Sequence, residues 1–286
     1  MDERVHQVRN TVVNLKATRD VFAANRATGR IALAVAADDN CTQRTRVHEE
    51  GSLRVRFPNA APHLLEAMVI NTAGGMTGGD EFSIKISLGA GAHLLAGTAA
   101  AEKIYRSTGP NTTIALAINA AAGSRCLWLP QETILFSRAR LSRRIDVDLA
   151  SDASLIMAEA VVFGRSAMGE TVQEGRLIDR WRVRRGDRLI FAESTRIDGA
   201  IGEKLTAAAV AAGGIAVATV LVTPGDEDRV AAVRSLADQF LGEVGISAWN
   251  GIALARLCAR NGAALRHDLV ILLTALGAPL PRLWLQ

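Results

Sequence analysis

The sequence has few of the residues that build disulfide frameworks or metal centres. Its three cysteines, Cys41, Cys126 and Cys258, lie far apart, form no C-x-x-C pair and are odd in number. This pattern argues against a disulfide framework and fits a reducing compartment. The five histidines are also scattered, and no H-x-x-x-H or H-E-x-x-H spacing offers a preformed zinc or nickel site.

Long apolar runs and targeting signals are missing as well. No stretch reaches the roughly 18 apolar residues of a membrane-spanning helix. Residues 1–30 carry charges throughout and have no apolar centre, so they do not resemble a signal peptide. We therefore expect a cytoplasmic protein without a membrane partner.

Aromatic residues are scarce, at 4% of the 286 residues, whereas hydrophobic residues make up 49% and charged residues 22%. A chain of this length buries a large core without disulfides, and here the core must consist of small and branched aliphatic side chains. Residues 1–28 show no clear period. We expect a loosely ordered N-terminal arm over residues 1–28 and a single domain over residues 29–286.

Short strands dominate the pattern after the arm. Apolar side chains alternate with polar or small ones in three segments, residues 83–88, 114–118 and 145–149. Such alternation is typical of strands with one buried face. Residues 155–163 are apolar except for Glu159, which favours a strand covered on both faces. Residues 177–191 have the pattern of a hairpin that turns at Gly186.

The last third of the sequence changes character. Residues 226–241 and 264–276 place apolar side chains at helical spacing, and Asp226 is suited to cap the first of these helices. Residues 216–222 and 252–257 have strand patterns. The sequence thus predicts a mainly β protein, with a coiled or solenoid-like layered sheet body and two helices in the C-terminal third.

The chain is mildly basic, with a formal net charge of +4 and an isoelectric point of about 9.3. Arginines recur in two groups, which are Arg138, Arg140, Arg143 and Arg144, then Arg180, Arg182, Arg184, Arg185 and Arg188. The groups fit either a solvated strand face or a docking surface for an acidic protein partner. Interleaved aromatic residues and known reader motifs are absent, which argues against a nucleic-acid partner.

The glycine-rich segment of residues 71–80 is the most unusual part of the sequence. Its two glycine pairs permit backbone conformations that other residues avoid, and they permit close approach by another chain or an ion. A phosphate loop would need Gly-Lys-Ser/Thr at its end, but Gly79 is followed by Asp80, which would repel phosphate. The alternatives are a structural tight turn and a turn that presents Asp80 to an ion.

Several carboxylates occupy unusual places. Glu159 interrupts an apolar strand, so it must be neutral, paired or exposed to a wet cavity, and Arg165 is a plausible partner. A structural ion pair is the plainer alternative. If Asp80, Glu132, Glu159 and Glu170 converged in one pocket, they would suit a metal-dependent hydrolase.

Four segments in order resemble the UreD (UreH) family of urease accessory proteins. They are the GGMTGGD run that ends at Asp80, Lys103 to Arg106 of a Lys-x-Tyr-Arg motif, the WLPQE-x-x-x-F segment of residues 128–136, and the GR-x-AMGE segment of residues 164–170. Each motif alone is weak, but the ordered set is specific. The resemblance extends from about residue 53 to about residue 199.

The resemblance implies a fold and a role. It implies an all-β coiled body with two helices, and a non-catalytic nickel-insertion chaperone. Such a chaperone binds UreF, and through it the GTPase UreG, in a dimeric accessory complex on apo-urease. It would hold no tightly bound cofactor, and nickel(II) would pass in transit through an internal tunnel. By resemblance, the candidate carboxylates for that path are Asp80, Glu159, Glu170 and Glu193, because carboxylates hold a hydrated divalent ion weakly enough to release it.

Overall fold

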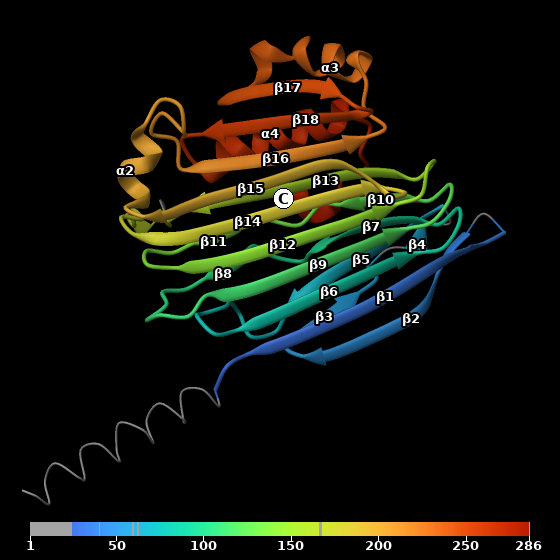
Figure 1. Cartoon of the computed structure of the whole chain (residues 1–286), viewed down its shortest axis with the longest axis horizontal. Helices are drawn as coiled ribbons and strands as arrows, with labels where there is room; N and C mark the ends of the chain where they lie inside the picture. The colour runs from blue at the N-terminus through green and yellow to red at the C-terminus, as the bar shows by residue number, and fades with distance from the viewer. Residues whose placement is uncertain (1–24, 40, 59, 62, 166–167, 286) are drawn as a thin grey trace, which may run out of the picture.

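The computed structural model describes residues 25–39, 41–58, 60–61, 63–165 and 168–285, and in it two β-sheets lie face to face (Figure 1). Within these residues the first sheet has seven strands in the order β15-β14-β12-β9-β6-β1-β2. Its strands are β1 (Thr28–Asp38), β2 (Cys41–Gly51), β6 (Glu81–Leu88), β9 (Thr112–Ala120), β12 (Arg140–Leu149), β14 (Gly175–Arg185) and β15 (Arg188–Gly199).

The second sheet has eleven strands in the described residues, eight of them in the order β17-β18-β16-β13-β10-β7-β5-β3. Strand β4 pairs with β5, while β11 pairs with β13 and β8. Its strands are β3 (Leu53–Arg56), β4 (Ala60–Ala61), β5 (Leu64–Asn71), β7 (His93–Thr98), β8 (Glu102–Ile104), β10 (Arg125–Trp128), β11 (Thr133–Leu135), β13 (Ser154–Phe163), β16 (Ala216–Thr223), β17 (Glu243–Trp249) and β18 (Ile252–Ala259).

The middle of the chain coils between the two sheets. In the first sheet, β6, β9, β12 and β14 pair in parallel, and in the second sheet β5, β7, β10 and β13 do the same. Each turn of the coil therefore adds one strand to each sheet. This arrangement confirms the predicted solenoid-like layered body.

The space between the sheets is filled by one face of each strand. Ile84, Ile86 and Leu88 of β6 and Ile145 and Val147 of β12 all belong to this core, because alternate residues of a strand point to the same side. A second core lies on the other face of the second sheet, under the helices. Every residue of β13 from Leu155 to Phe163 is buried, which confirms a strand covered on both faces.

The helices lie late in the chain. Helix α4 lies behind β16 and β18 (Figure 1), and Asn261 caps it by accepting from the Ala264 N–H at 2.8 Å. Asp226 caps α3 as predicted, by accepting from the Arg229 N–H at 2.9 Å. The helical segments are α2 (Ile201–Thr206), α3 (Glu227–Arg234), α4 (Gly262–Ala275) and the 3-10 turns η2 (Ala237–Gln239) and η3 (Arg282–Trp284).

One helix prediction needs correction, and one helix was not predicted. The helix expected over residues 226–241 ends at Arg234, and the chain continues through η2 instead. Helix α2 was not predicted, because its six residues are too few to show a period. The hairpin at Gly186 is confirmed, with φ of 56° at this glycine. Of the expected N-terminal arm, residues 1–24 lie outside the described residues, so the division into an arm and one domain stays a prediction.

None of the helices in the described part of the chain has the length and apolar character needed to cross a membrane.

Candidate functional site

A buried ionic cluster joins the two sheets. Arg143 of β12 points inward and contacts Asp179 of the neighbouring strand β14, its Cα partner in the sheet, and Glu159 of β13 in the other sheet. Its Nε donates to Asp179 Oδ1 at 3.1 Å, its Nη2 donates to Asp179 Oδ2, and its Nη1 donates to Glu159 Oε2. Trp128 Nε1 donates to the other oxygen of Glu159 at 2.8 Å.

The cluster carries an excess of negative charge in an apolar setting. One guanidinium faces two carboxylates, and Arg143, Glu159 and Asp179 are 5%, 7% and 8% exposed. Burial raises the pKa of Glu159, while the positive charge of Arg143 and the hydrogen bond from Trp128 act in the opposite direction. Buried charges of this kind persist only where each has a partner, so the three side chains depend on one another.

A small cavity adjoins the cluster. Its volume is about 50 Å³, which is space for roughly three to five water molecules at 10–15 Å³ each. Its polar lining comes from both sheets and consists of Thr98, Glu102, Gln131, Thr133, Arg143 and Glu159. The rest of the wall is apolar, including Met76 of the glycine-rich segment.

Glu102, at the start of β8, is one of the side chains that line this cavity. It is half-buried, as is its partner Asn71, whose Nδ2 donates to Glu102 Oε2 at 3.2 Å. Burial raises the pKa of Glu102, and the bond from Asn71 lowers it to a smaller extent. Glu102 was absent from the predicted ligands, since its surroundings in the sequence are alanines and Lys103.

The glycine-rich segment is a close-packed turn that Asp80 holds in place. Asp80 is 3% exposed, and its two oxygens accept from the backbone N–H groups of Ala27 at 2.9 Å and Thr77 at 2.7 Å. Gly75 adopts a φ of 154°, and a Cβ there would lie 2.3 Å from the ring of Tyr105. The structure thus favours the tight-turn alternative, in which Asp80 anchors the turn to the residue before β1.

The other predicted carboxylates are bound elsewhere. Glu170 accepts from Arg165 Nε at 2.8 Å, and this bond lowers the pKa of Glu170. Glu193 of β15 accepts from Arg256 of β18 at 3.0 and 2.5 Å. The expected pairing of Glu159 with Arg165 is therefore wrong, because Arg165 binds Glu170.

Comparison with known protein families decides the identity of the chain. The profile described as "UreD urease accessory protein" matches residues 27–285. The chain belongs to the UreD family. It is 54% identical over 266 residues to the urease accessory protein UreD of Rhodopseudomonas palustris strain BisA53, which covers 93% of each chain. It is 51% identical over 272 residues to that of Bradyrhizobium diazoefficiens, which covers 95% of this chain and 99% of the relative.

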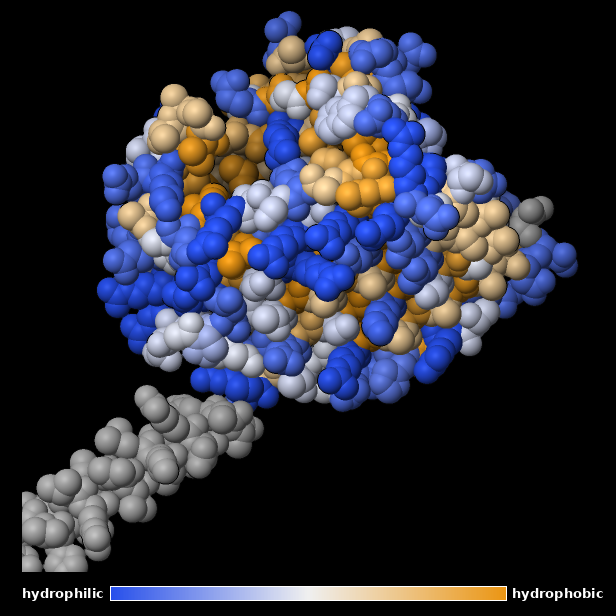
Figure 2. Space-filling view, in the orientation of Figure 1, coloured by the Kyte–Doolittle hydropathy of each residue, from blue (hydrophilic) through white to orange (hydrophobic). Residues whose placement is uncertain are grey.

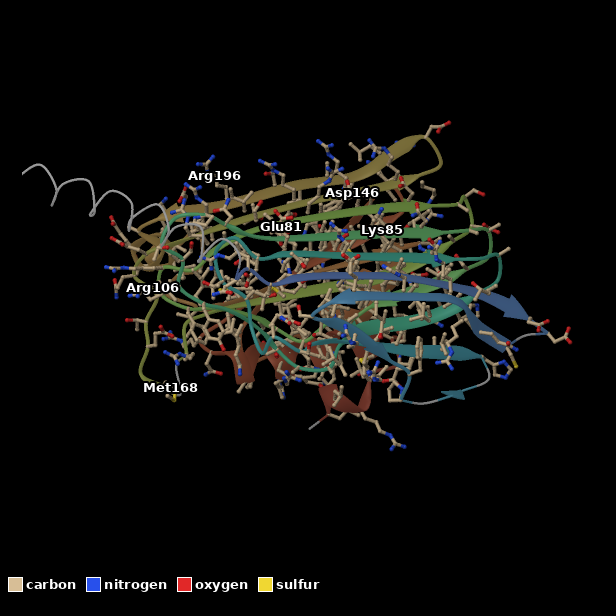
Figure 3. All side chains as sticks on the ribbon, turned by 90° about the horizontal axis from the view of Figure 1, so that it is seen from below. Glu81, Lys85, Arg106, Asp146, Met168 and Arg196 are labelled. Carbon is tan, nitrogen blue, oxygen red and sulfur yellow. The ribbon has the colours of Figure 1, made fainter. Side chains whose placement is uncertain are left out.

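All four family segments meet at one end of this UreD-family chain. The Tyr105 hydroxyl donates to the Gly74 carbonyl at 3.2 Å, the Tyr105 and Phe136 rings pack edge to face at 4.9 Å, and the Arg165 guanidinium lies 4.3 Å from the Phe136 centroid. The side chains of Tyr105, Phe136 and Arg165 border an open surface basin of about 750 Å³ that Arg106 also lines. Figure 3 shows Arg106 and Met168 at this end of the molecule.

Charged side chains cover the outer face of the first sheet, where Figure 3 shows Lys85, Asp146 and Arg196, and Figure 2 shows hydrophilic residues across the same side. Most of the predicted arginine groups lie here, but Arg143 does not, because it follows the inward alternation of Leu141 and Ile145. The solvated-face interpretation therefore holds for neighbours such as Arg144 and is wrong for Arg143.

Each of the candidate carboxylates of this UreD-family chain, Asp80, Glu159, Glu170 and Glu193, accepts hydrogen bonds from a different set of donors. The described residues also contain no group of three or more His, Cys, Asp and Glu that could hold a metal ion. Glu132 is bound by Arg266 of α4 at 2.6 Å. The hydrolase alternative, which needs convergent ligands, has no support here.

Replacing Glu102 by glutamine tests its raised pKa. Because the folded-state pKa lies above the ordinary value of 4.5, the neutral acid favours folding at low pH, and this contribution is lost as the pH rises through the folded pKa. We expect Glu102→Gln, which stays neutral, to be more stable than the wild type at pH 7 and nearly equal to it at pH 4. Urea unfolding at both pH values measures the difference. A difference that does not change with pH would contradict the raised pKa.

Proposed function

We propose that this chain is a non-catalytic scaffold of urease maturation that passes nickel(II) through its interior to apo-urease. It acts in the cytoplasm, in a dimeric accessory complex in which it binds UreF and, through UreF, the GTPase UreG. The observation that carries the proposal is the cavity between the sheets, which places Glu102 and Glu159 on one polar lining. Carboxylate oxygens bind hydrated divalent ions, and a path requires that they bind weakly enough to release them.

The path is proposed to use two of these carboxylates directly. Glu102 is half-buried and lines the cavity, and Glu159 lines it as a member of the ionic cluster. We assign Asp80, Glu170 and Glu193 supporting positions, since each already accepts hydrogen bonds that fix a turn or join two strands. The absence of paired cysteines and histidines from the cavity lining favours transit over storage.

Conservative variants test the path. Glu102→Gln and Glu159→Gln, each co-expressed with urease and its accessory proteins, should reduce the nickel content and activity of urease several-fold, while UreF still co-purifies. Asp198→Asn is a matched control, because Asp198 pairs with Arg176 and Arg196 away from the cavity. If both glutamine variants bind UreF and load urease normally, nickel does not use this cavity.

A further inference from the structure

The two carboxylates of the buried cluster are held in different ways. Asp179 receives two parallel hydrogen bonds from Arg143 and comes from the adjacent strand, directly opposite it. Glu159 receives only one bond from Arg143 and belongs to the other sheet. Two-point pairing of guanidinium and carboxylate is the stronger and more directional arrangement. Arg143 is therefore anchored by two hydrogen bonds to Asp179 and binds Glu159 through one.

The cavity touches the cluster on the side of Glu159, which Arg143 binds through a single hydrogen bond. Arg143 and Glu159 line it, whereas Asp179 is not among its lining residues. Glu159 therefore lines the cavity with both of its oxygens engaged, one by Arg143 and the other by Trp128, which also line it. The small volume also requires an ion in the cavity to lose part of its water shell, so that protein oxygens replace the lost waters.

We infer that Arg143 is a tethered counter-cation, which Asp179 holds against Glu159 and which a divalent cation displaces from Glu159 in passing. This inference rests on the proposed nickel path. The exchange leaves no buried charge unpaired, because Arg143 keeps Asp179 while Glu159 binds the ion. The nearby guanidinium then repels the ion through a medium of low dielectric constant, so the ion does not stay. Arg143 thus converts a carboxylate pair that would trap a cation into one that releases it.

Removing the guanidinium should turn the site into a trap. We expect purified full-length Arg143→Met to retain an extra equivalent of nickel per chain in equilibrium dialysis, compared with the wild type. The double variant Arg143→Met/Glu159→Gln should lose this extra ion. A folded Arg143→Met that retains no more nickel than the wild type would overturn the inference.

Arg176→Met is the matched control for losing an arginine. Arg176 of β14 binds Asp198 of β15, its Cα partner, through two nitrogens at 3.0 and 2.8 Å, but on the partly exposed edge of the first sheet. Its loss should leave nickel retention unchanged. Equal gains in Arg176→Met and Arg143→Met would show that any unpaired carboxylate binds nickel, and would overturn the special role of the cluster.

Folding gives a second readout if Arg143→Met is unstable. With two unpaired buried carboxylates, this variant should fold better when nickel is present, whereas Arg143→Met/Glu159→Gln/Asp179→Asn should fold without nickel and not respond to it. If nickel does not improve the folding of Arg143→Met while the triple variant folds, then Glu159 and Asp179 do not accept the ion.

A variant of Asp179, the anchor of Arg143, separates the inferred ion exchange from the proposed nickel path. In Asp179→Asn the guanidinium loses its charged anchor and has Glu159 as its only anionic partner, so the chain should retain no more nickel than the wild type and urease loading should fall. If Glu102→Gln and Glu159→Gln load urease normally, the path fails, while nickel retention by purified Arg143→Met still decides the exchange.

Discussion

Arg143→Met lowers the free energy of unfolding by about 3–5 kcal/mol when no divalent ion is present, as expected for breaking a buried ion pair by removing one partner. The methionine leaves Glu159 and Asp179 charged, buried and close together. Burial already raises the pKa of Glu159, so the variant should recover part of its stability at low pH, where this carboxyl is neutral. Urea unfolding in the presence of a chelator at pH 7 and pH 5 measures both effects.

The size of this effect depends on the unpaired charges and not on the lost arginine volume. Arg143→Met/Glu159→Gln/Asp179→Asn should therefore recover most of the stability, because replacing a whole buried ionic group by neutral residues is often nearly neutral. A triple variant as unstable as Arg143→Met would show that packing, and not charge, dominates at this position.

Asp80→Ala is expected to lower the free energy of unfolding by about 2–4 kcal/mol, since a buried donor left unpaired costs about 1–3 kcal/mol and the two donors here are partly buried. The substitution leaves the N–H groups of Ala27 and Thr77 without their acceptors. Asp80→Asn keeps one acceptor oxygen but turns an amide group toward the other donor, so its loss should be intermediate. Urea unfolding curves for both variants, read for midpoint and slope, give the comparison.

The same two variants examine what the glycine-rich turn does for urease. If Asp80 is a support, urease loading falls only as far as the amount of folded protein falls. A stable, folded Asp80→Asn that fails to load urease would return Asp80 to the ion path as a ligand.

The coiled β body could be predicted from the sequence because it depends on local alternation. The segments at residues 83–88, 114–118 and 145–149 became β6, β9 and β12, and the apolar run that contains Glu159 became the doubly covered β13. The same alternation also contained the signal for Arg143, which shares its face with Leu141 and Ile145. The arginine-rich composition outweighed this signal and led to the interpretation of the whole group as a surface feature, either solvated or used for docking.

Other parts of the site were not readable from the sequence. Glu159 pairs with a residue 16 positions earlier because the coil places β12 and β13 in facing sheets, and local spacing does not reveal that offset. Arg165 is closer to Glu159 in the chain, but it lies past the end of β13 and binds Glu170. Glu102 and Asn71 meet across 31 residues because the coil returns the chain to the second sheet, an offset that local spacing also does not reveal.

Strand β13 is a member of two cores at once. Leu155, Met157 and Val161 pack between the sheets, on the side of Glu159, whereas Ile156 and Ala158 pack against the helix layer. One backbone thus forms a mechanical connection between the ionic cluster and the surface formed by the helices. A displacement of the helix layer would therefore move the strand that carries Glu159, without any contact to Glu159 itself.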